Sequence, residues 1–144
     1  MTTYTLNDGS LLCWAVFTLD PGTPDRTPVR VGLRWDPNYP LAVTMEFIAR
    51  DTMPVTWVLS RDALADGMTF PAGLSDYQVF PVANPTCVGL HLESLSGTAT
   101  FSMSAEVLRS FLAMSYNRCP RGAEYAGYDV DSELAELIAE EGAA

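Results

Sequence analysis

The chain has 144 residues, enough for one ordinary domain that needs no disulfide or metal to hold its core. Its 18 acidic residues outnumber its 8 basic ones, so the formal net charge is −10. A chain this acidic is repelled by nucleic-acid phosphates and by anionic membranes, so we expect it to bind no nucleic acid. No apolar run is long enough to span a membrane, so we expect no membrane insertion. The lack of a secretory signal and the odd number of cysteines favour a cytoplasmic protein.

Seven segments have the alternating or apolar composition of β-strands. In the segment from Val29 to Trp35, apolar residues alternate with Arg30, Gly32 and Arg34. Turn sequences such as Asp36-Pro37-Asn38 separate the segments. The seven predicted strands are residues 11–19, 29–35, 43–47, 55–59, 77–82, 88–92 and 99–103.

The first predicted strand is apolar on both of its faces. One row consists of Leu11, Cys13, Ala15 and Phe17, and the opposite row of Leu12, Trp14 and Val16. A strand of this kind is either enclosed between two layers or covered by a partner. We therefore expect a homo-oligomer with Leu12, Trp14 and Val16 near the contact between subunits.

Helices are fewer and lie mainly toward the C-terminus. Ser60 is placed to cap a short helix over residues 61–66, and Ser104 to cap a longer one. A third helix is predicted to begin near Asp129 or Asp131, with the apolar stripe Leu134, Leu137 and Ile138. Seven strands followed by two helices predict an α+β domain with a largely antiparallel sheet.

No residue pattern points firmly to catalysis, and we expect no cofactor, no metal and no enzymatic activity. The single histidine, His91, lies about 13 Å along a strand from Cys87, too far for the two to share one metal ion. His91 is either a surface or interface residue or, alternatively, a catalytic base. The acidic residues Asp129, Asp131 and Glu133 fit helix capping, and they also have the chemistry to bind a cation or to act as an acid–base pair.

Three tryptophans have side chains of the type on which single-stranded nucleic acids stack their bases. Trp14, Trp35 and Trp57 all fall on predicted strands, in apolar rows that we expect to belong to the core. Base-stacking sites need a basic groove, and only eight arginines are present in the chain. Packing is therefore favoured over base stacking.

Several blocks of the sequence resemble the SsgA-like family of actinomycete sporulation and cell-division proteins. The match runs from about Val31 to Ile138. Each block alone is a weak signal, but the blocks together are fairly specific because of their order and spacing. The blocks are Leu33-Arg34-Trp35-Asp36, Pro40-Leu41-Ala42-Val43, Trp57-Val58 with Arg61-Asp62-x-Leu64-x-x-Gly67, Pro71-x-Gly73-x-x-Asp76, Val79-x-Pro81, Phe111-Leu112, Gly122-x-Glu124 and Asp129-x-Asp131-x-Glu133-Leu134.

The resemblance implies a curved sheet with terminal helices, similar to the whirly-type nucleic-acid binders, and assembly as a trimer. It also implies a cytoplasmic, non-enzymatic protein that acts at the division septum during sporulation. Its expected partners are other SsgA-like proteins and the tubulin-like division GTPase FtsZ, which the best-understood branch recruits. The alternative, suggested by the whirly-like fold, is a single-stranded nucleic-acid binding module.

A partner must contact polar residues that the core does not use. The strand and helix patterns leave five charged residues facing outward, and several of them lie in the family's blocks. These candidates for partner binding are Arg34, Arg61, Asp62, Asp129 and Glu133.

Overall fold

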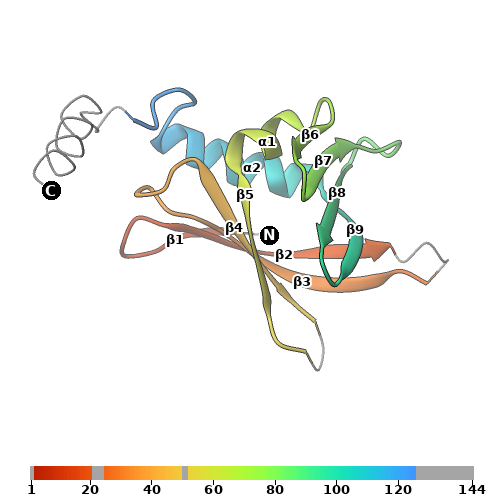
Figure 1. Cartoon of the computed structure of the whole chain (residues 1–144). Coiled ribbons are helices and arrows are strands. Elements are labelled where there is room, and N and C mark those ends of the chain that lie inside the picture. The colour runs from red at the N-terminus through yellow and green to blue at the C-terminus, as the bar shows by residue number, and fades with distance from the viewer. Residues whose placement is uncertain (1, 21–24, 50–51, 126–144) are drawn as a thin grey trace, which may run out of the picture.

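The computed structural model describes residues 2–20, 25–49 and 52–125, and these form one curved antiparallel sheet with two helices (Figure 1). The predicted α+β class and antiparallel pairing are confirmed. Along the sheet the strands follow the order β5-β4-β3-β2-β9-β8-β7-β6, with β1 paired to β2. The strands are β1 (Thr3–Thr5), β2 (Leu11–Asp20), β3 (Thr27–Trp35), β4 (Ala42–Ile48), β5 (Val55–Ser60), β6 (Ala72–Leu74), β7 (Tyr77–Pro81), β8 (Cys87–Ser94) and β9 (Gly97–Ser104).

The predicted number of strands is wrong, because the described residues form nine strands rather than seven. The two additions, β1 and β6, have three residues each. A segment that short contains too few residues to show a two-residue period. Both are held by pairing with a longer neighbour, β2 and β7 respectively.

Helices α1 (Arg61–Asp66) and α2 (Ala105–Arg118) lie together on one side of the sheet, at the top of Figure 1. Both predicted caps are confirmed: the hydroxyl oxygens of Ser60 and Ser104 accept hydrogen bonds from the N–H groups of Ala63 and Val107. One face of α2 is buried in the core. The third predicted helix lies outside the described residues.

The core lies between the helices and the inner face of the sheet. Residues of odd number in β2 and β3 point into it, from Leu11 to Phe17 and from Val29 to Trp35. The even-numbered residues therefore lie on the opposite, outer face of the sheet. This arrangement confirms the alternation predicted for β3.

The sheet curves until its two ends approach each other near α1. The Ser60 N–H, at the end of β5, donates to the hydroxyl of Tyr77 on β7 at 2.9 Å. Just after α1, Gly67 packs so closely on Val79 that an added Cβ would lie 2.4 Å from the valine side chain. Helix α1 thus fills the space between the two ends of the sheet, where β5 and β7 are not hydrogen-bonded to each other as neighbouring strands.

Candidate functional site

Cross-strand pairing brings the predicted subunit-contact row and one predicted partner-binding residue, Arg34, onto one surface. Leu12 pairs with Arg34, and Val16 pairs with Arg30, so the proposed subunit-contact row and the outward arginines are direct neighbours. The pairing continues to β1 on one side and to β4 and β5 on the other. We call this surface the outer face, and it consists of Tyr4, Leu12, Trp14, Val16, Arg30, Arg34, Thr44, Glu46, Thr56 and Val58.

Trp14 lies flat on the outer face because its cross-strand neighbour is a glycine. A Cβ added to Gly32 would lie 3.0 Å from the indole ring, so a larger residue there would push the ring away. The guanidinium of Arg30 stacks on the same ring, 4.5 Å from its centroid. Trp14 is therefore half-buried on the outer face, and its predicted place in the core is wrong.

Arg34 is exposed on the outer face, as predicted. Its Nη2 lies 3.2 Å from Oδ2 of Asp8, and both side chains are about half exposed. The backbone N–H of Ser10 donates to the Asp8 carboxylate, and this hydrogen bond together with the charge of Arg34 lowers the pKa of Asp8. An exposed pair of this kind contributes little to stability, so the arginine is available to a partner.

The outward position predicted for Arg61 is wrong. Its side chain is fully buried, and Nη2 lies 3.1 Å from Oε1 of Glu124. The guanidinium also lies over the rings of Tyr116 and Trp35, 4.1 and 5.6 Å from their centroids. A charge enclosed in this way holds α1 to the end of the described chain.

Asp62, the next candidate, is partly exposed, and its carboxylate already binds two other side chains of the chain. The hydroxyl of Tyr116 donates to its Oδ1 at 2.6 Å, and the Nε of Arg121 lies 3.2 Å from the same oxygen. Arg121 also pairs with Asp66 at 2.9 Å. Burial and the bond to Asp62 raise the pKa of Tyr116 to about 12. The remaining candidates, Asp129 and Glu133, lie outside the described residues.

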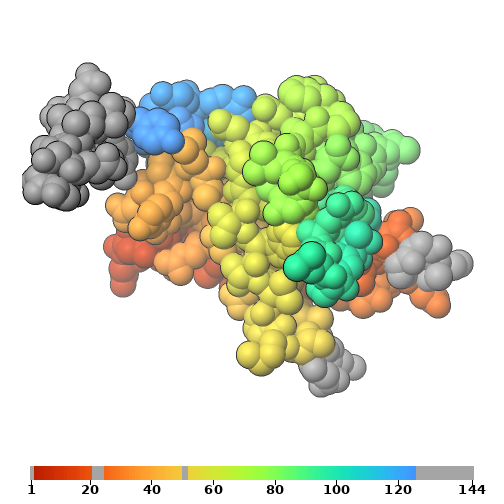
Figure 2. Space-filling view, in the orientation of Figure 1, coloured from red at the N-terminus to blue at the C-terminus, as the bar shows by residue number. Residues whose placement is uncertain are grey.

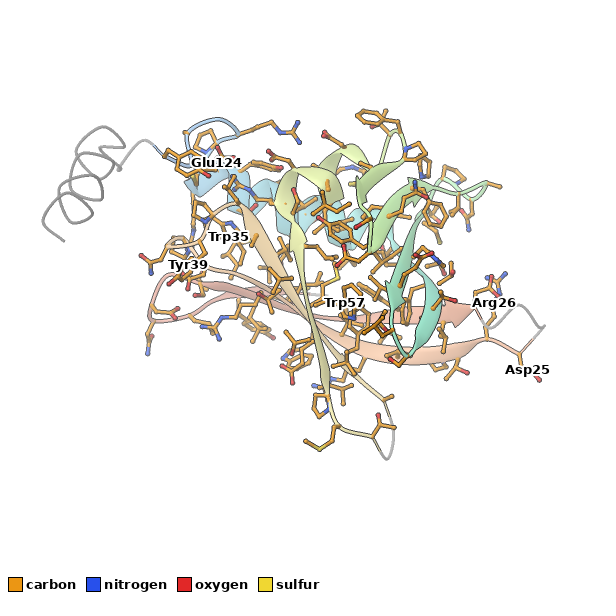
Figure 3. The ribbon with its side chains drawn as sticks, in the orientation of Figure 1. Asp25, Arg26, Trp35, Tyr39, Trp57 and Glu124 are labelled. Atoms are coloured by element: carbon orange, nitrogen blue, oxygen red, sulfur yellow. The ribbon has the colours of Figure 1, made fainter. Side chains whose placement is uncertain are left out.

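The other two tryptophans differ from each other. Trp35 is fully buried, as predicted, and its indole N–H donates to the carbonyl of Pro40 at 3.0 Å. Trp57 is only half-buried and faces an apolar groove with a volume of about 310 Å³. Figures 2 and 3 show this region between the yellow strand β5 and the teal β8–β9 hairpin. The sequence analysis missed the groove, since it depends on the separation of two hairpins that are distant in sequence.

A second hollow lies beside the end of the described chain. It has a volume of about 260 Å³ and is lined by the β3–β4 turn together with Glu124 and Tyr125. Tyr39 and Glu124 mark this end of the molecule in Figure 3. Tyr39 also lines a neighbouring hollow of about 270 Å³ that contains Arg34, Thr44 and Val58. The two hollows connect the end of the described chain to the outer face.

The environment of His91 fits a structural role on the surface. Its Nδ1 lies 2.7 Å from the hydroxyl of Thr100, and its Nε2 lies 3.3 Å from the carboxylate of Glu93. Within the described part of the chain, no group of three or more His, Cys, Asp or Glu residues is placed to hold a metal ion. No helix there is long and apolar enough to cross a membrane.

Comparison with known proteins identifies the family. A sequence profile described as "Streptomyces sporulation and cell division protein, SsgA" matches residues 29–124, about two thirds of the chain. The chain belongs to the SsgA family. The matched residues include both members of the buried ion pair, Arg61 and Glu124.

Individual relatives agree with this assignment. The sporulation-specific cell division protein SsgB of Saccharopolyspora erythraea is 40% identical over 126 residues, which cover 86% of this chain and 89% of the relative. The SsgB of Streptomyces coelicolor is 36% identical over 115 residues, covering 78% and 84% respectively. These names support a role for the family in cell division during sporulation, and the family is not one of enzymes.

Solved structures share the fold. One, from a study titled "Mutations in SsgB correlate to longitudinal cell division during sporulation of Streptomyces coelicolor", superimposes with a TM-score of 0.78 at 31% identity, covering 83% of this chain and 95% of that one. The SsgA-like sporulation-specific cell division protein of Thermobifida fusca gives a TM-score of 0.77 at 27% identity, covering 93% and 99%. The curved antiparallel sheet of this chain is thus shared with solved members of the family.

Proposed function

We propose that this protein localises or activates septum formation during sporulation, and that it does so by binding a division protein through its outer face. FtsZ, the tubulin-like division GTPase, is the partner that we favour. Family membership supports the process, since relatives sharing up to 40% of their residues are named sporulation-specific cell division proteins. A cytoplasmic location at the division septum belongs to the same proposal.

The observation that carries the proposal is the composition of the outer face. It combines exposed apolar side chains, such as Val16 and Val58, with Trp14, Arg30 and Arg34. Tryptophan and arginine are the residue types that most often dominate the energy of protein interfaces.

We assign different contacts to the two halves of this face. Leu12, Trp14 and Val16, on β2, are proposed to lie at the contact between copies in a homotrimer or with other SsgA-like proteins. Arg34 and Val58, on β3 and β5, are proposed to contact the division protein. Light scattering checks the first assignment: we expect a trimer, and a monomer at micromolar concentration contradicts it.

The second assignment is tested by exchanging single arginines. We expect Arg34→Ala to weaken binding to purified FtsZ and to reduce septal localisation of a fluorescent fusion, with an unchanged melting temperature. Arg109→Ala is the matched control, because Arg109 is an exposed arginine on α2, away from the outer face. Equal binding by both variants and the wild type would show that the outer face is not the recognition surface.

A nucleic-acid binding function is the second candidate, and one contact favours it. The stacked pair of Trp14 and Arg30 on an open sheet surface has the chemistry that single-stranded nucleic acids bind. Against it stands the net charge of −10, which opposes the approach of a phosphate backbone. A gel shift with a labelled oligonucleotide separates the two functions.

A further inference from the structure

Acidic charge is concentrated at the end of the chain. Residues 126–144, which lie outside the described residues, contain six acidic residues and no basic residue. They therefore carry a formal charge of −6, while residues 1–125, with twelve acidic and eight basic residues, carry −4. We call residues 126–144 the acidic segment, and its acidic residues are Asp129, Asp131, Glu133, Glu136, Glu140 and Glu141.

Two arginines on the outer face could form ion pairs with the carboxylates of the acidic segment. Arg30 stacks on Trp14 and pairs with no carboxylate among the described residues. Arg34 pairs with Asp8, but that pair is half exposed and easily exchanged for another carboxylate. Strand β2 also carries Asp20, but strands β3, β4 and β5 supply one acidic residue, Glu46, to the outer face. Together with Arg30 and Arg34, the side chains of these three strands therefore give their half of the face a formal charge of +1.

The described chain ends beside this face. Tyr125, the last described residue, lines one hollow together with Tyr39 and Leu41. Tyr39 also lines the next hollow, which contains Arg34 and Val58. The acidic segment therefore starts next to the β3–β5 half of the outer face.

The segment has enough length and suitable composition to cover that half. Nineteen residues span about 28 Å even as a helix, whereas Arg34 and Arg30 lie about 13 Å apart along β3. Besides its acids, the segment has the apolar residues Val130, Leu134, Leu137 and Ile138. The area beside it exposes apolar groups of its own: Tyr39, Leu41 and Val58 are 72%, 40% and 61% exposed.

We propose that the acidic segment binds the β3–β5 half of the outer face of its own chain. Its carboxylates lie at Arg34 and Arg30, and its apolar residues cover Leu41 and Val58. The segment then competes with the division protein for the same surface. The competition rests on the proposed function, whereas the contact within the chain does not.

The contact is tested by NMR on the full-length protein, uniformly labelled. We expect nuclear Overhauser effects between the methyl groups of Leu134, Leu137 or Ile138 and those of Leu41 and Val58. The amide signals of Arg30 and Arg34 should move in about 0.5 M sodium chloride, since salt screens exposed charges.

Two variants with the same change of charge sharpen this test. Neutralising three acids of the segment, as Asp131→Asn, Glu133→Gln and Glu136→Gln, should move the Arg30 and Arg34 signals. The control variant carries Asp25→Asn, Asp76→Asn and Glu106→Gln, which lie outside the segment and the outer face, and it should leave those signals in place.

Two results overturn the contact. In one, the Overhauser effects are absent and both variants have the wild-type signals at Arg30 and Arg34. In the other, the effects appear only between differently labelled copies, which would make a second copy the occupant of the face.

The competition is tested with purified FtsZ and the same two variants. If the segment covers the face in most molecules, the neutralised variant should bind about threefold more tightly or better, and the control variant like the wild type. Equal affinities of all three proteins for FtsZ would overturn the proposed competition, but they would not contradict the contact between the acidic segment and the outer face. A complete lack of FtsZ binding by all three overturns the proposed function and the competition with it, while the NMR result still decides the contact.

Discussion

The Nη2 of Arg61 lies 3.1 Å from Oε1 of Glu124, although 63 residues separate them in the chain. Both side chains are buried, and the guanidinium is enclosed by the rings of Trp35 and Tyr116. The Nε of Arg61 has no hydrogen-bond partner among the described residues. The ion pair therefore connects the first turn of α1 to the end of the described chain.

Removing one member of this pair should destabilise the fold severely. We expect Arg61→Ala to lower the free energy of unfolding by about 3–5 kcal/mol, because it leaves the carboxylate of Glu124 buried without its partner. Urea denaturation followed by circular dichroism measures the change. Arg109→Ala, an exposed arginine, should change it by less than about 0.5 kcal/mol.

The double variant Arg61→Met with Glu124→Leu provides the contrast. It replaces both charges with apolar groups, so it should recover much of the stability that Arg61→Ala loses. An Arg61→Ala protein as stable as the wild type would mean that the pair does not hold α1 in place.

Tyr116 should cause the free energy of unfolding to decrease at alkaline pH. Burial and the hydrogen bond to Asp62 raise its pKa to about 12, whereas an unfolded tyrosine titrates near pH 10. The stabilising contribution of the neutral phenol is therefore complete below about pH 10 and is lost as the pH rises toward 12. We expect the stability of the wild type to fall more over this interval than that of Tyr116→Phe, as measured by denaturation at each pH.

Tyrosinate absorbance offers an independent measurement. One of the six tyrosines should titrate near pH 12, and this step should be missing in Tyr116→Phe. The substitution leaves Asp62 paired with Arg121, so the variant should still fold. An unchanged titration curve in the variant argues against the buried hydrogen bond.

Local sequence patterns predicted much of the fold. The alternation in 29–35 placed Val31, Leu33 and Trp35 in the core and Arg34 on the surface, because a strand's two faces follow from its own residues. The caps at Ser60 and Ser104 were predictable for the same reason, since each acts on a backbone group three residues away. The three-residue strands β1 and β6 were missed because they form only by pairing with a neighbour.

The site depended on contacts that no local pattern contains. Arg61 occupies an apparently exposed turn of a short helix, and only the distant residues Glu124, Trp35 and Tyr116 enclose it. Trp14 reads equally well as a core or a surface residue, and its place on the outer face follows from the whole row of β2. The register that pairs Leu12 with Arg34 joined the predicted subunit-contact row to one of the five predicted partner-binding residues.

The outer face should not bind nucleic acid, despite its tryptophan and arginines. Most non-specific affinity comes from the release of counterions by many basic groups, and this chain has a net charge of −10. We expect no shift of a labelled single-stranded oligonucleotide at physiological salt and micromolar protein. A shift that weakens with added salt and is lost in Arg30→Ala would instead favour the nucleic-acid function.

Strand β5 should expose alternate amide groups along its outer edge. Among the strands that the structure describes it pairs only with β4, and the N–H of Ser60 points away from β4 toward Tyr77. Since N–H directions alternate along an antiparallel strand, those of Thr56 and Val58 also point away from β4. Those of Trp57 and Leu59 point toward it.

Hydrogen exchange of the full-length protein measures this alternation directly. We expect the amides of Thr56 and Val58 to exchange much faster than those of Trp57 and Leu59, because only the latter pair bond to β4. Addition of a partner that extends the sheet should slow exchange at Thr56 and Val58 alone, whereas a partner that covers the outer face should leave their rates nearly unchanged. Uniformly slow exchange along β5 in the isolated protein would mean that another strand, from a second copy, already occupies this edge.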